Sequence, residues 1–192
     1  GVRFFRHKFI SFDALVFTNL SPEHIESHGS FEKYLEAKLK LADSLNSSKK
    51  ENKILTVNAD DENAGMFVSR TPKARAIQFR LKELEPLVVK KEGLEFTLFG
   101  QKMISHLSGE FNAYNILAAA TAARALGVPV ETMKTTVEKF KGIRGRMEKI
   151  EAGQNFTVIV DYAHTADSME KVYEVFQRQR KKPKMQPILL PQ

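Results

Sequence analysis

The sequence predicts an α/β fold, with a mostly parallel sheet flanked by helices and a small antiparallel β region. Three observations support this fold class. Apolar runs rich in β-branched residues alternate along the chain with segments whose apolar residues recur at helical spacing. The polar residues 161–168 lie between such a run, 156–160, and such a segment, 169–176. Residues 74–107 contain only short β-type runs.

The first part of the chain alternates predicted strands with predicted helices. Residues 12–18 are expected to form a buried strand that ends in a polar loop. Ser30 is expected to cap a helix that begins at Phe31. Residues 54–57 form the next predicted strand, and a short helix is expected around residues 64–68.

Residues 74–107 differ in character from the rest of the chain. Glu92 and Gly93 are typical of a hairpin turn between two strands. We therefore expect an antiparallel insertion here rather than another β-α-β unit. Its predicted strands are residues 74–79, 87–90, 94–99 and 103–107.

Two helices and a pair of strands are predicted after this insertion. The first helix is rich in Ala and Leu and ends before Gly127. The strands are expected to pair across Gly153, and the second is expected to be buried. The predicted helices are residues 111–126 and 130–140, and the predicted strands are residues 147–151 and 156–160.

Composition indicates a folded protein of a reducing compartment. The chain has 192 residues, 42% of them hydrophobic, so it can bury a core. It contains no cysteine, which excludes disulfides and thiolate zinc sites. No apolar run approaches membrane-spanning length, and no signal-type segment is present near residue 1. We expect a cytoplasmic protein without a membrane partner.

The formal net charge of +7 does not indicate a nucleic-acid-binding protein, because of how the charge is distributed. Five basic residues lie in the last sixteen residues, which contain no acid. Subtracting these five from +7 leaves only +2 for residues 1–176. A basic, proline-containing tail is more often a solvated end than a binding surface, so we expect no nucleic-acid partner.

Four polar clusters follow predicted strands or open predicted helices. In open α/β sheets, ligands bind at the carboxyl ends of strands and at helix N-termini. The shared placement of the clusters therefore predicts one crevice to which all four contribute. The clusters are residues 19–28, 58–62, 109–115 and 161–168.

The first two clusters allow either a metal site or a structural role. Glu23, His24 and His28 are donor types for a metal, although two histidines alone make a poor Mg²⁺ site. The alternative is an ordinary loop that enters a helix. Asp60 and Asp61 are suited to holding Mg²⁺-bound waters or to capping the following helix, and capping is the commoner outcome.

The third cluster and a basic turn offer groups for a nucleotide. Asn112 is a candidate N-cap, whereas Asn115 lies inside the helix, where an amide has poor propensity. The amide of Asn115 has the donor and the acceptor that suit the edge of adenine. Arg144 and Arg146 are candidates for binding phosphate oxygens, and plain surface exposure is the alternative.

The fourth cluster combines several kinds of hydrogen-bonding group. Asp161 is a candidate ribose acceptor and His164 a candidate ring donor, while Thr165 is suited to capping the next helix. Lys38, on the helix after the first cluster, lies among charged residues and is by itself typical of a solvated lysine.

Together these residues resemble the Mur ligase family, and within it the ligases that add the third residue of the peptidoglycan peptide. No one motif is specific, but six occur in the family's order over residues 12–176. The matching stretches are residues 17–29, 34–39, 58–61, 109–119, 145–148 and the sequence Asp-Tyr-Ala-His-Thr at 161–165.

The resemblance implies roles for individual residues. His24 would ligate a second Mg²⁺, and Lys38 would be carbamylated, which gives it oxygens able to ligate the same ion. These two residues would belong to the catalytic centre. For the nucleotide, Asn115 would contact adenine, Arg146 would lie near the nucleotide, Asp161 would bind the ribose, and His164 would belong to the same nucleotide-facing motif.

The implied reaction is the formation of an amide bond driven by ATP, with ATP and Mg²⁺ as cofactors. ATP would phosphorylate a carboxylate of a UDP-N-acetylmuramoyl-dipeptide. The amine of an amino acid would then attack the acyl phosphate and release phosphate. Mg²⁺ and basic groups would stabilise the charge on the transferred phosphoryl group.

The chain also departs from the family pattern. It contains no Gly-x-x-x-x-Gly-Lys motif, and nothing matches the family's upstream Mg²⁺-binding glutamate or its uridine-nucleotide-binding domain. We therefore expect a piece of the enzyme without ligase activity of its own. Residues 1–164 would belong to the central ATP-binding domain, and residues 165–192 to the start of the C-terminal domain and a divergent basic tail.

Two alternatives remain from the sequence. One is a related ligase on the same scaffold, of the folylpolyglutamate or cyanophycin type, which the full-length gene would distinguish. The other is a non-catalytic remnant. Retention of His24, Lys38, Asn115 and Asp161 argues against the remnant, because a degenerate site has no reason to keep all four.

Overall fold

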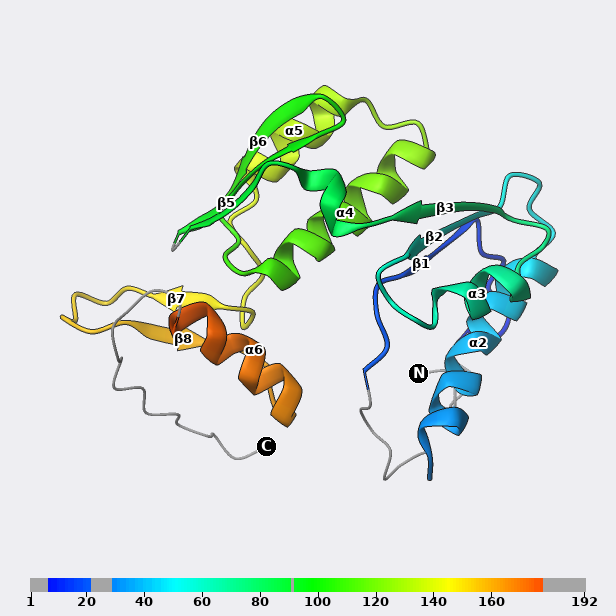
Figure 1. Cartoon of the computed structure of the whole chain (residues 1–192), viewed down its shortest axis with the longest axis horizontal. Coiled ribbons are helices and arrows are strands. Elements are labelled where there is room, and N and C mark those ends of the chain that lie inside the picture. Colours follow the sequence, from blue (N-terminus) through cyan, green and yellow to red (C-terminus); the bar gives the residue numbers. More distant parts are fainter. Residues whose placement is uncertain (1–6, 22–28, 91, 178–192) are drawn as a thin grey trace.

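The structure is a computed structural model that describes residues 7–21, 29–90 and 92–177. Figure 1 shows three β assemblies connected along the chain: a parallel sheet, an antiparallel sheet and a C-terminal hairpin. The predicted fold class, α/β with a parallel sheet and a small antiparallel region, is confirmed.

The parallel sheet has three strands in the order β1-β2-β3. The central strand, β2, is buried along its whole length, as its apolar sequence predicts. The edge strand β1 differs from the prediction of a buried strand, because only Phe17 is buried and Val16 is 40% exposed. The strands are β1 (Ala14–Phe17), β2 (Ile54–Asn58) and β3 (Arg75–Phe79).

The prediction that residues 74–79 belong to the antiparallel insertion is wrong. β3 pairs parallel with β2, with Ile54 opposite Arg75 and Asn58 opposite Phe79. A parallel connection needs a crossover, and here the crossover contains only the short helix α3, Ala64–Arg70. Because this helix is so short, the sequence pattern does not indicate a β-α-β unit.

Helix α2, Phe31–Ser47, begins at the predicted N-cap. The Ser30 hydroxyl accepts a hydrogen bond from the Lys33 main-chain N–H at 3.3 Å, so this prediction is confirmed. The apolar face of α2 packs with α3 and with the inward side chains of β1 and β2. The buried members of this core are Phe17, Leu20, Tyr34, Leu35, Leu39, Ala42, Leu45, Leu55, Val57, Ala64 and Phe67.

Helix α4, Glu110–Ala125, lies between the two sheets. It contacts β1, β2 and β3 as well as the short 3₁₀ helix η2, Leu81–Leu84, and helix α5, Val130–Lys139. A second core joins α4 to the antiparallel sheet. The buried members of this core are Phe79, Leu84, Leu94, Phe96, Leu98, Met103, Ala113, Ile116, Leu117, Ala118, Ala120 and Met133.

The antiparallel sheet has the order β4-β5-β6. Lys90 pairs with Gly93, so the predicted hairpin turn at Glu92 and Gly93 is confirmed. Alternate residues of β5 point toward α4, which gives this sheet one packed face. The strands are β4 (Leu87–Lys90), β5 (Gly93–Leu98) and β6 (Gln101–Ser105).

The C-terminal part contains a hairpin and a helix. β7, Glu148–Ile150, pairs antiparallel with β8, Val158–Val160, as predicted. The prediction that this second strand is buried is wrong, because β8 belongs to a two-stranded sheet and Val160 is 41% exposed. Helix α6, Ala166–Gln177, follows the hairpin. The division into residues 1–164 and 165–192 stays a prediction.

Every helix within residues 7–21, 29–90 and 92–177 is too short or too polar to cross a bilayer.

Lys53, a buried lysine just before β2, binds the carbonyl oxygens at the C-terminal end of α2. Its side chain is only 8% exposed, and its Nζ donates to the carbonyl oxygens of Asn46 at 2.9 Å and Ser48 at 3.1 Å. These are C-terminal carbonyls that have no partner within the helix. The last turn of α2 carries no basic residue of its own, so Lys53 supplies the positive charge from outside the helix.

We predict that Lys53→Met lowers the free energy of unfolding by about 1–3 kcal/mol, because two carbonyl oxygens lose a charged donor. The matched control is Lys49→Met on the exposed loop after α2, which should change stability by less than about 0.5 kcal/mol. Urea denaturation of both variants measures the difference. Equal stabilities would show that Lys53 does not hold the helix end.

Candidate functional site

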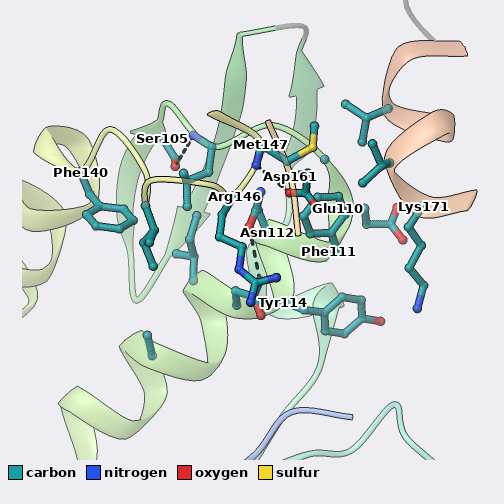
Figure 2. A pocket seen from close by; sticks show the side chains of 18 of the residues that line it. Ser105, Glu110, Phe111, Asn112, Tyr114, Phe140, Arg146, Met147, Asp161 and Lys171 are labelled. Atoms are coloured by element: carbon teal, nitrogen blue, oxygen red, sulfur yellow. Dashed lines mark hydrogen bonds between the residues drawn. The ribbon is translucent and has the colours of Figure 1, made fainter. Parts of the chain in front are cut away.

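A cavity of about 1540 Å³ lies between α4, α6, the end of β8 and the loop before β7. All four polar clusters contribute to its lining, so the predicted convergence on one crevice is confirmed. In Figure 2, Phe140 and Lys171 lie at opposite sides of this space, and Arg146 lies between them. The contributions of the clusters are Asn19 and Ser21; Asn58; Gly109–Asn112, Tyr114 and Asn115; and Asp161–His164 with Ser168.

Asn58 joins the ends of two neighbouring strands at the cavity. It is only 6% exposed, and its Nδ2 donates to the Thr18 carbonyl oxygen at 2.8 Å. Its Oδ1 accepts from the main-chain N–H of Asp60 at 3.0 Å. One amide therefore fixes the residue after β1 and the turn after β2 at the carboxyl edge of the sheet.

Asp61 has a structural role, but the prediction that it caps α3 is wrong, because the N-cap is Asn63 and no side chain makes a capping hydrogen bond there. One carboxylate oxygen accepts from the Asn63 main-chain N–H at 2.8 Å, at the entrance to α3. The other accepts from the main-chain N–H of Leu20 at 2.9 Å. Asp61 thus holds the segment after β1 against the start of α3.

Asp60 makes a different set of contacts, one of them to Tyr114, which lines the cavity. Its Oδ2 accepts from the Leu81 main-chain N–H at 2.8 Å and from the Tyr114 hydroxyl at 3.1 Å. Burial of the phenol, followed by this hydrogen bond and the negative charges of Asp60 and Glu110, raises the pKa of Tyr114 to about 12. The bond links the turn after β2 to the first turns of α4.

The start of α4 is set by Gly109 and not by Asn112, so the N-cap prediction is wrong. Gly109 is the N-cap with φ of 92°, a conformation that favours glycine. A Cβ there would lie 2.8 Å from the Phe111 ring and 2.9 Å from a Val175 methyl group. The close approach of α6 therefore requires a glycine at this position.

Inside the helix, the two asparagines contact each other on the cavity side. Nδ2 of Asn112 donates to the Ser108 carbonyl oxygen at 2.8 Å. Its Oδ1 accepts from Nδ2 of Asn115 at 3.3 Å. Asn115 is exposed and lines the cavity, and its amide carries both a donor and an acceptor.

Asp161 holds the main chain on two sides. Its Oδ1 accepts from the Ala163 N–H at 2.7 Å, and its Oδ2 accepts from the Met147 N–H at 2.7 Å. Met147 has φ of 49°, a left-handed conformation that costs a non-glycine residue about 1–2 kcal/mol. The bond to Asp161 helps to keep Met147 in this conformation.

Arg146, Tyr162 and His164 form a row on the cavity wall. The Arg146 guanidinium lies 4.7 Å from the centroid of the Tyr162 ring. The ring of His164 meets that of Tyr162 edge-on, with centroids 4.9 Å apart, and its Nδ1 lies 2.9 Å from the Tyr162 carbonyl oxygen. Arg144 is exposed and is not among the described residues lining the cavity, in agreement with the surface alternative.

Thr165 caps α6, as the capping alternative predicts. Its Oγ1 accepts from the Ser168 main-chain N–H at 3.3 Å, and the Ser168 hydroxyl accepts from the Thr165 N–H at 3.0 Å. This reciprocal pair resembles a capping box and fixes where the helix begins after the polar cluster.

Lys38 is not among the described residues that line the cavity. Its Nζ lies 5.3 Å from the centroid of the Tyr34 ring, one turn earlier on α2. His24, its expected partner, lies outside the described residues, as do Glu23 and His28. Within residues 7–21, 29–90 and 92–177, no three His, Asp or Glu side chains gather in a way that could hold a metal ion.

The sequence interpretation missed one end of the cavity. Apolar residues of α5 and its flanking segments line this end, together with Ala119 and Ala123 of α4. No polar signature marks them, and the spacing in α5 is that of an ordinary core helix. The missed apolar residues are Val128, Met133, Val137, Phe140 and Ile143.

The burial of Tyr114, together with its bond to Asp60, predicts an unusual titration. Because the folded-state pKa is raised from 10.0 to about 12, the neutral phenol stabilises the fold. This stabilisation is complete below about pH 10 and is lost as the pH rises toward 12. We predict that Asp60→Asn lowers the Tyr114 pKa, which stays above 10 because burial remains.

Ultraviolet titration of phenolate formation measures this pKa. Tyr114→Phe should remove the late component of this titration, near pH 12. Tyr162→Phe, at a 62% exposed ring, is the control and should leave the late component in place. A late component that survives Tyr114→Phe would contradict the assignment.

Comparison with known sequences identifies two matching domains. The Mur ligase middle domain matches residues 5–123, and the Mur ligase, glutamate ligase domain matches residues 145–189. The UDP-N-acetylmuramyl-tripeptide synthetase of Roseiflexus sp. (strain RS-1) is 39% identical over 181 residues, which cover 86% of this chain and 36% of that protein. The UDP-N-acetylmuramoyl-L-alanyl-D-glutamate--2,6-diaminopimelate ligase of Halalkalibacterium halodurans is 39% identical over 170 residues, covering 84% and 35%.

Solved structures show the same fold. MurF from Acinetobacter baumannii aligns with a TM-score of 0.77 at 19% identity, over 88% of this chain and 38% of that one. The MurF ligase of Thermotoga maritima in complex with ADP aligns with a TM-score of 0.66 at 22% identity, over 86% and 39%. The chain spans about a third of the length of the curated relatives that it matches. With the middle-domain match extending over more than half of its residues, the chain belongs to the Mur ligase family.

Proposed function

We propose that this chain is part of an ATP-dependent ligase of peptidoglycan biosynthesis. The ligase would join an amino acid to a UDP-N-acetylmuramoyl-dipeptide in the cytoplasm. The observation that supports this most is the convergence of Asn115, Arg146, Asp161 and His164 on one cavity, although they come from separate parts of the chain. The names of the relatives, a tripeptide synthetase and a diaminopimelate ligase, point to the same reaction.

The cavity offers groups for each part of ATP. The free amide atoms of Asn115 suit the edge of adenine. Each carboxylate oxygen of Asp161 accepts one main-chain hydrogen bond and keeps a second lone pair, which suits a ribose hydroxyl. The guanidinium of Arg146 offers paired donors for phosphate oxygens. The apolar end near Met133 and Val137 would exclude water from one side of the ligand.

The proposed reaction has two steps. A substrate carboxylate attacks the γ-phosphorus of ATP, which forms an acyl phosphate and releases ADP. The amine of the incoming amino acid then attacks the acyl carbon, so that a C–N bond forms, a C–O bond breaks and phosphate and a proton leave. The first step needs stabilisation of negative charge on the transferred group, and a cation such as Arg146 contributes to it.

Mg²⁺ would neutralise phosphate charge in this reaction, but the described residues alone do not assemble a site for it. A carbamate on Lys38 would add two oxygens to the donor set. Its formation joins the lysine amine to CO₂ and releases a proton. With His24, this carbamate would complete the ligand set that the family resemblance implies.

We predict that the 192-residue chain binds MgATP weakly and does not catalyse ligation. These residues contain no Gly-Lys pair, so they lack the glycine-rich loop whose N–H groups and lysine cradle phosphates in such enzymes. Calorimetric titration with MgATP should give a Kd above about 100 μM, equivalent to a binding free energy weaker than about −5.5 kcal/mol.

Two amide variants test where the nucleotide binds. Asn115→Ala should weaken MgATP binding further, because it removes the amide that faces the cavity. Gln154→Ala is the matched control and should leave the affinity unchanged, because Gln154 lies in the turn between β7 and β8 and is not among the described lining residues.

A Kd ten or more times tighter than about 100 μM, or release of ADP that depends on the dipeptide substrate and an amino acid, would contradict the prediction. Equal MgATP affinity in Asn115→Ala and the unchanged chain would show that the nucleotide does not occupy this cavity.

We also predict that Lys38 carries a carbamate when the chain is held in ¹³C-labelled bicarbonate. The labelled carbon should give a carbamate signal in the ¹³C spectrum, and Lys38→Ala should remove it. Lys40→Ala is the matched control, because Lys40 is an exposed lysine on the same helix. A signal that persists in Lys38→Ala would assign the modification to another amine.

A further inference from the structure

The loop that carries Arg146 makes few hydrogen bonds of its own. Residues 140–147 connect α5 to β7, and the Arg146 N–H donates to the Ile143 carbonyl oxygen at 3.0 Å. Gly145 and Met147, on either side of Arg146, both have positive φ, at 71° and 49°. This backbone needs support from outside the loop to keep one conformation.

Two carboxylates provide that support. The N–H of Gly145 donates to Glu148 Oε2 at 2.7 Å, and the N–H of Met147 donates to Asp161 Oδ2 at 2.7 Å. Both acceptors belong to one hairpin, because Glu148 pairs with Val160, the residue before Asp161. The residue before Arg146 and the residue after it are therefore both hydrogen-bonded to side chains of the same hairpin region.

The side chain of Arg146 is held from the same hairpin. Its guanidinium lies 4.7 Å from the ring centroid of Tyr162, which follows Asp161. Figure 2 shows the Arg146 side chain reaching from its loop toward the first half of α4, where Asn112 and Tyr114 are labelled. Glu148 is half-buried and is not among the described residues lining the cavity.

We propose that Glu148 is a positioning residue, which holds the loop by its bond to Gly145 so that Arg146 points into the cavity toward a bound anion. The part that concerns the anion rests on the proposed nucleotide function. The part that concerns the conformation of the loop does not.

A role of Glu148 through its charge and a role in positioning Arg146 predict opposite effects on anion affinity when Glu148 is removed. A carboxylate near an anion site repels the anion, so its removal on charge grounds alone would strengthen binding. If Glu148 positions Arg146, its removal weakens binding instead. Gln keeps the reach and an acceptor but removes the charge, whereas Asp keeps the charge but has a side chain shorter by one methylene.

The first experiment uses amide NMR of the whole chain without nucleotide. In Glu148→Ala and Glu148→Asp, the Gly145 amide should shift and exchange with solvent faster, and the Tyr162 ring signals should move as the Arg146 stack loosens. Glu148→Gln should keep both near their original values. The matched control is Glu151→Ala, which removes an exposed carboxylate that pairs with Lys149.

The second experiment follows MgADP binding by the same spectra. Glu148→Ala and Glu148→Asp should raise the Kd about five- to tenfold, because the loop loses its bond to the Gly145 N–H. Glu148→Gln should stay within about twofold, because it keeps an acceptor for that bond. In an Arg146→Ala background, Glu148→Ala should have no further effect, because Glu148 acts through the arginine.

Unchanged Gly145 and Tyr162 signals in both Glu148→Ala and Glu148→Asp would overturn the proposal. Tighter MgADP binding in Glu148→Ala would also overturn it. So would a loss of affinity from Glu148→Ala that is as large in the Arg146→Ala background as in the unchanged chain. If Glu148→Ala does not fold, the Gln and Asp variants decide the question. If the unchanged chain binds no MgADP while the loop signals respond as expected, the proposed nucleotide function fails and the positioning of Arg146 stands.

Discussion

The position of α4 is the constraint on which the site depends. This helix packs against all three strands of the parallel sheet and against the antiparallel sheet through a shared core. Its register is then fixed at the first turns, where Tyr114 donates to Asp60 and Gly109 allows α6 to approach. Packing of this kind leaves little freedom to slide or rotate, because interiors are close-packed. Asn115 therefore reaches the cavity as a consequence of the core and not of local helix propensity.

The elements that the sequence predicts best are those with strong local signals. The apolar strand β2, the cap at Ser30 and the hairpin turn at Gly93 are all recognisable from composition and spacing alone. Pairing partners are harder to predict, because an apolar run indicates a strand but not its neighbour. For this reason the sequence prediction assigns β3 to the wrong sheet and expects β8 to be more buried than a two-stranded hairpin allows.

The candidate site residues also differ in whether the sequence alone singles them out. The candidate nucleotide-binding residues Asn115, Arg146 and Asp161 come together in the structure, where all three line one cavity. Tyr114 has no such signal, because its importance arises from a bond to Asp60, 54 residues away. Glu148 lies in the matching stretch 145–148, but the sequence does not reveal its local bond to the Gly145 N–H. The apolar end of the cavity is unpredictable for the same reason, because residues that line a hollow have the same sequence pattern as residues that fill a core.

The carboxylate of Asp161 shows why structural and binding roles are hard to separate at this site. Its two oxygens already accept bonds from Met147 and Ala163, yet each keeps a lone pair for a ligand. An amide in its place would offer one oxygen and turn its NH₂ group toward a main-chain N–H, a contact between two donors. The loop of Arg146 would then lose an anchor, and the proposed contact to a ribose would lose an acceptor. A loss of affinity at Asp161 therefore measures both roles together, whereas Glu148, which stands outside the described cavity lining, isolates the contribution of the loop.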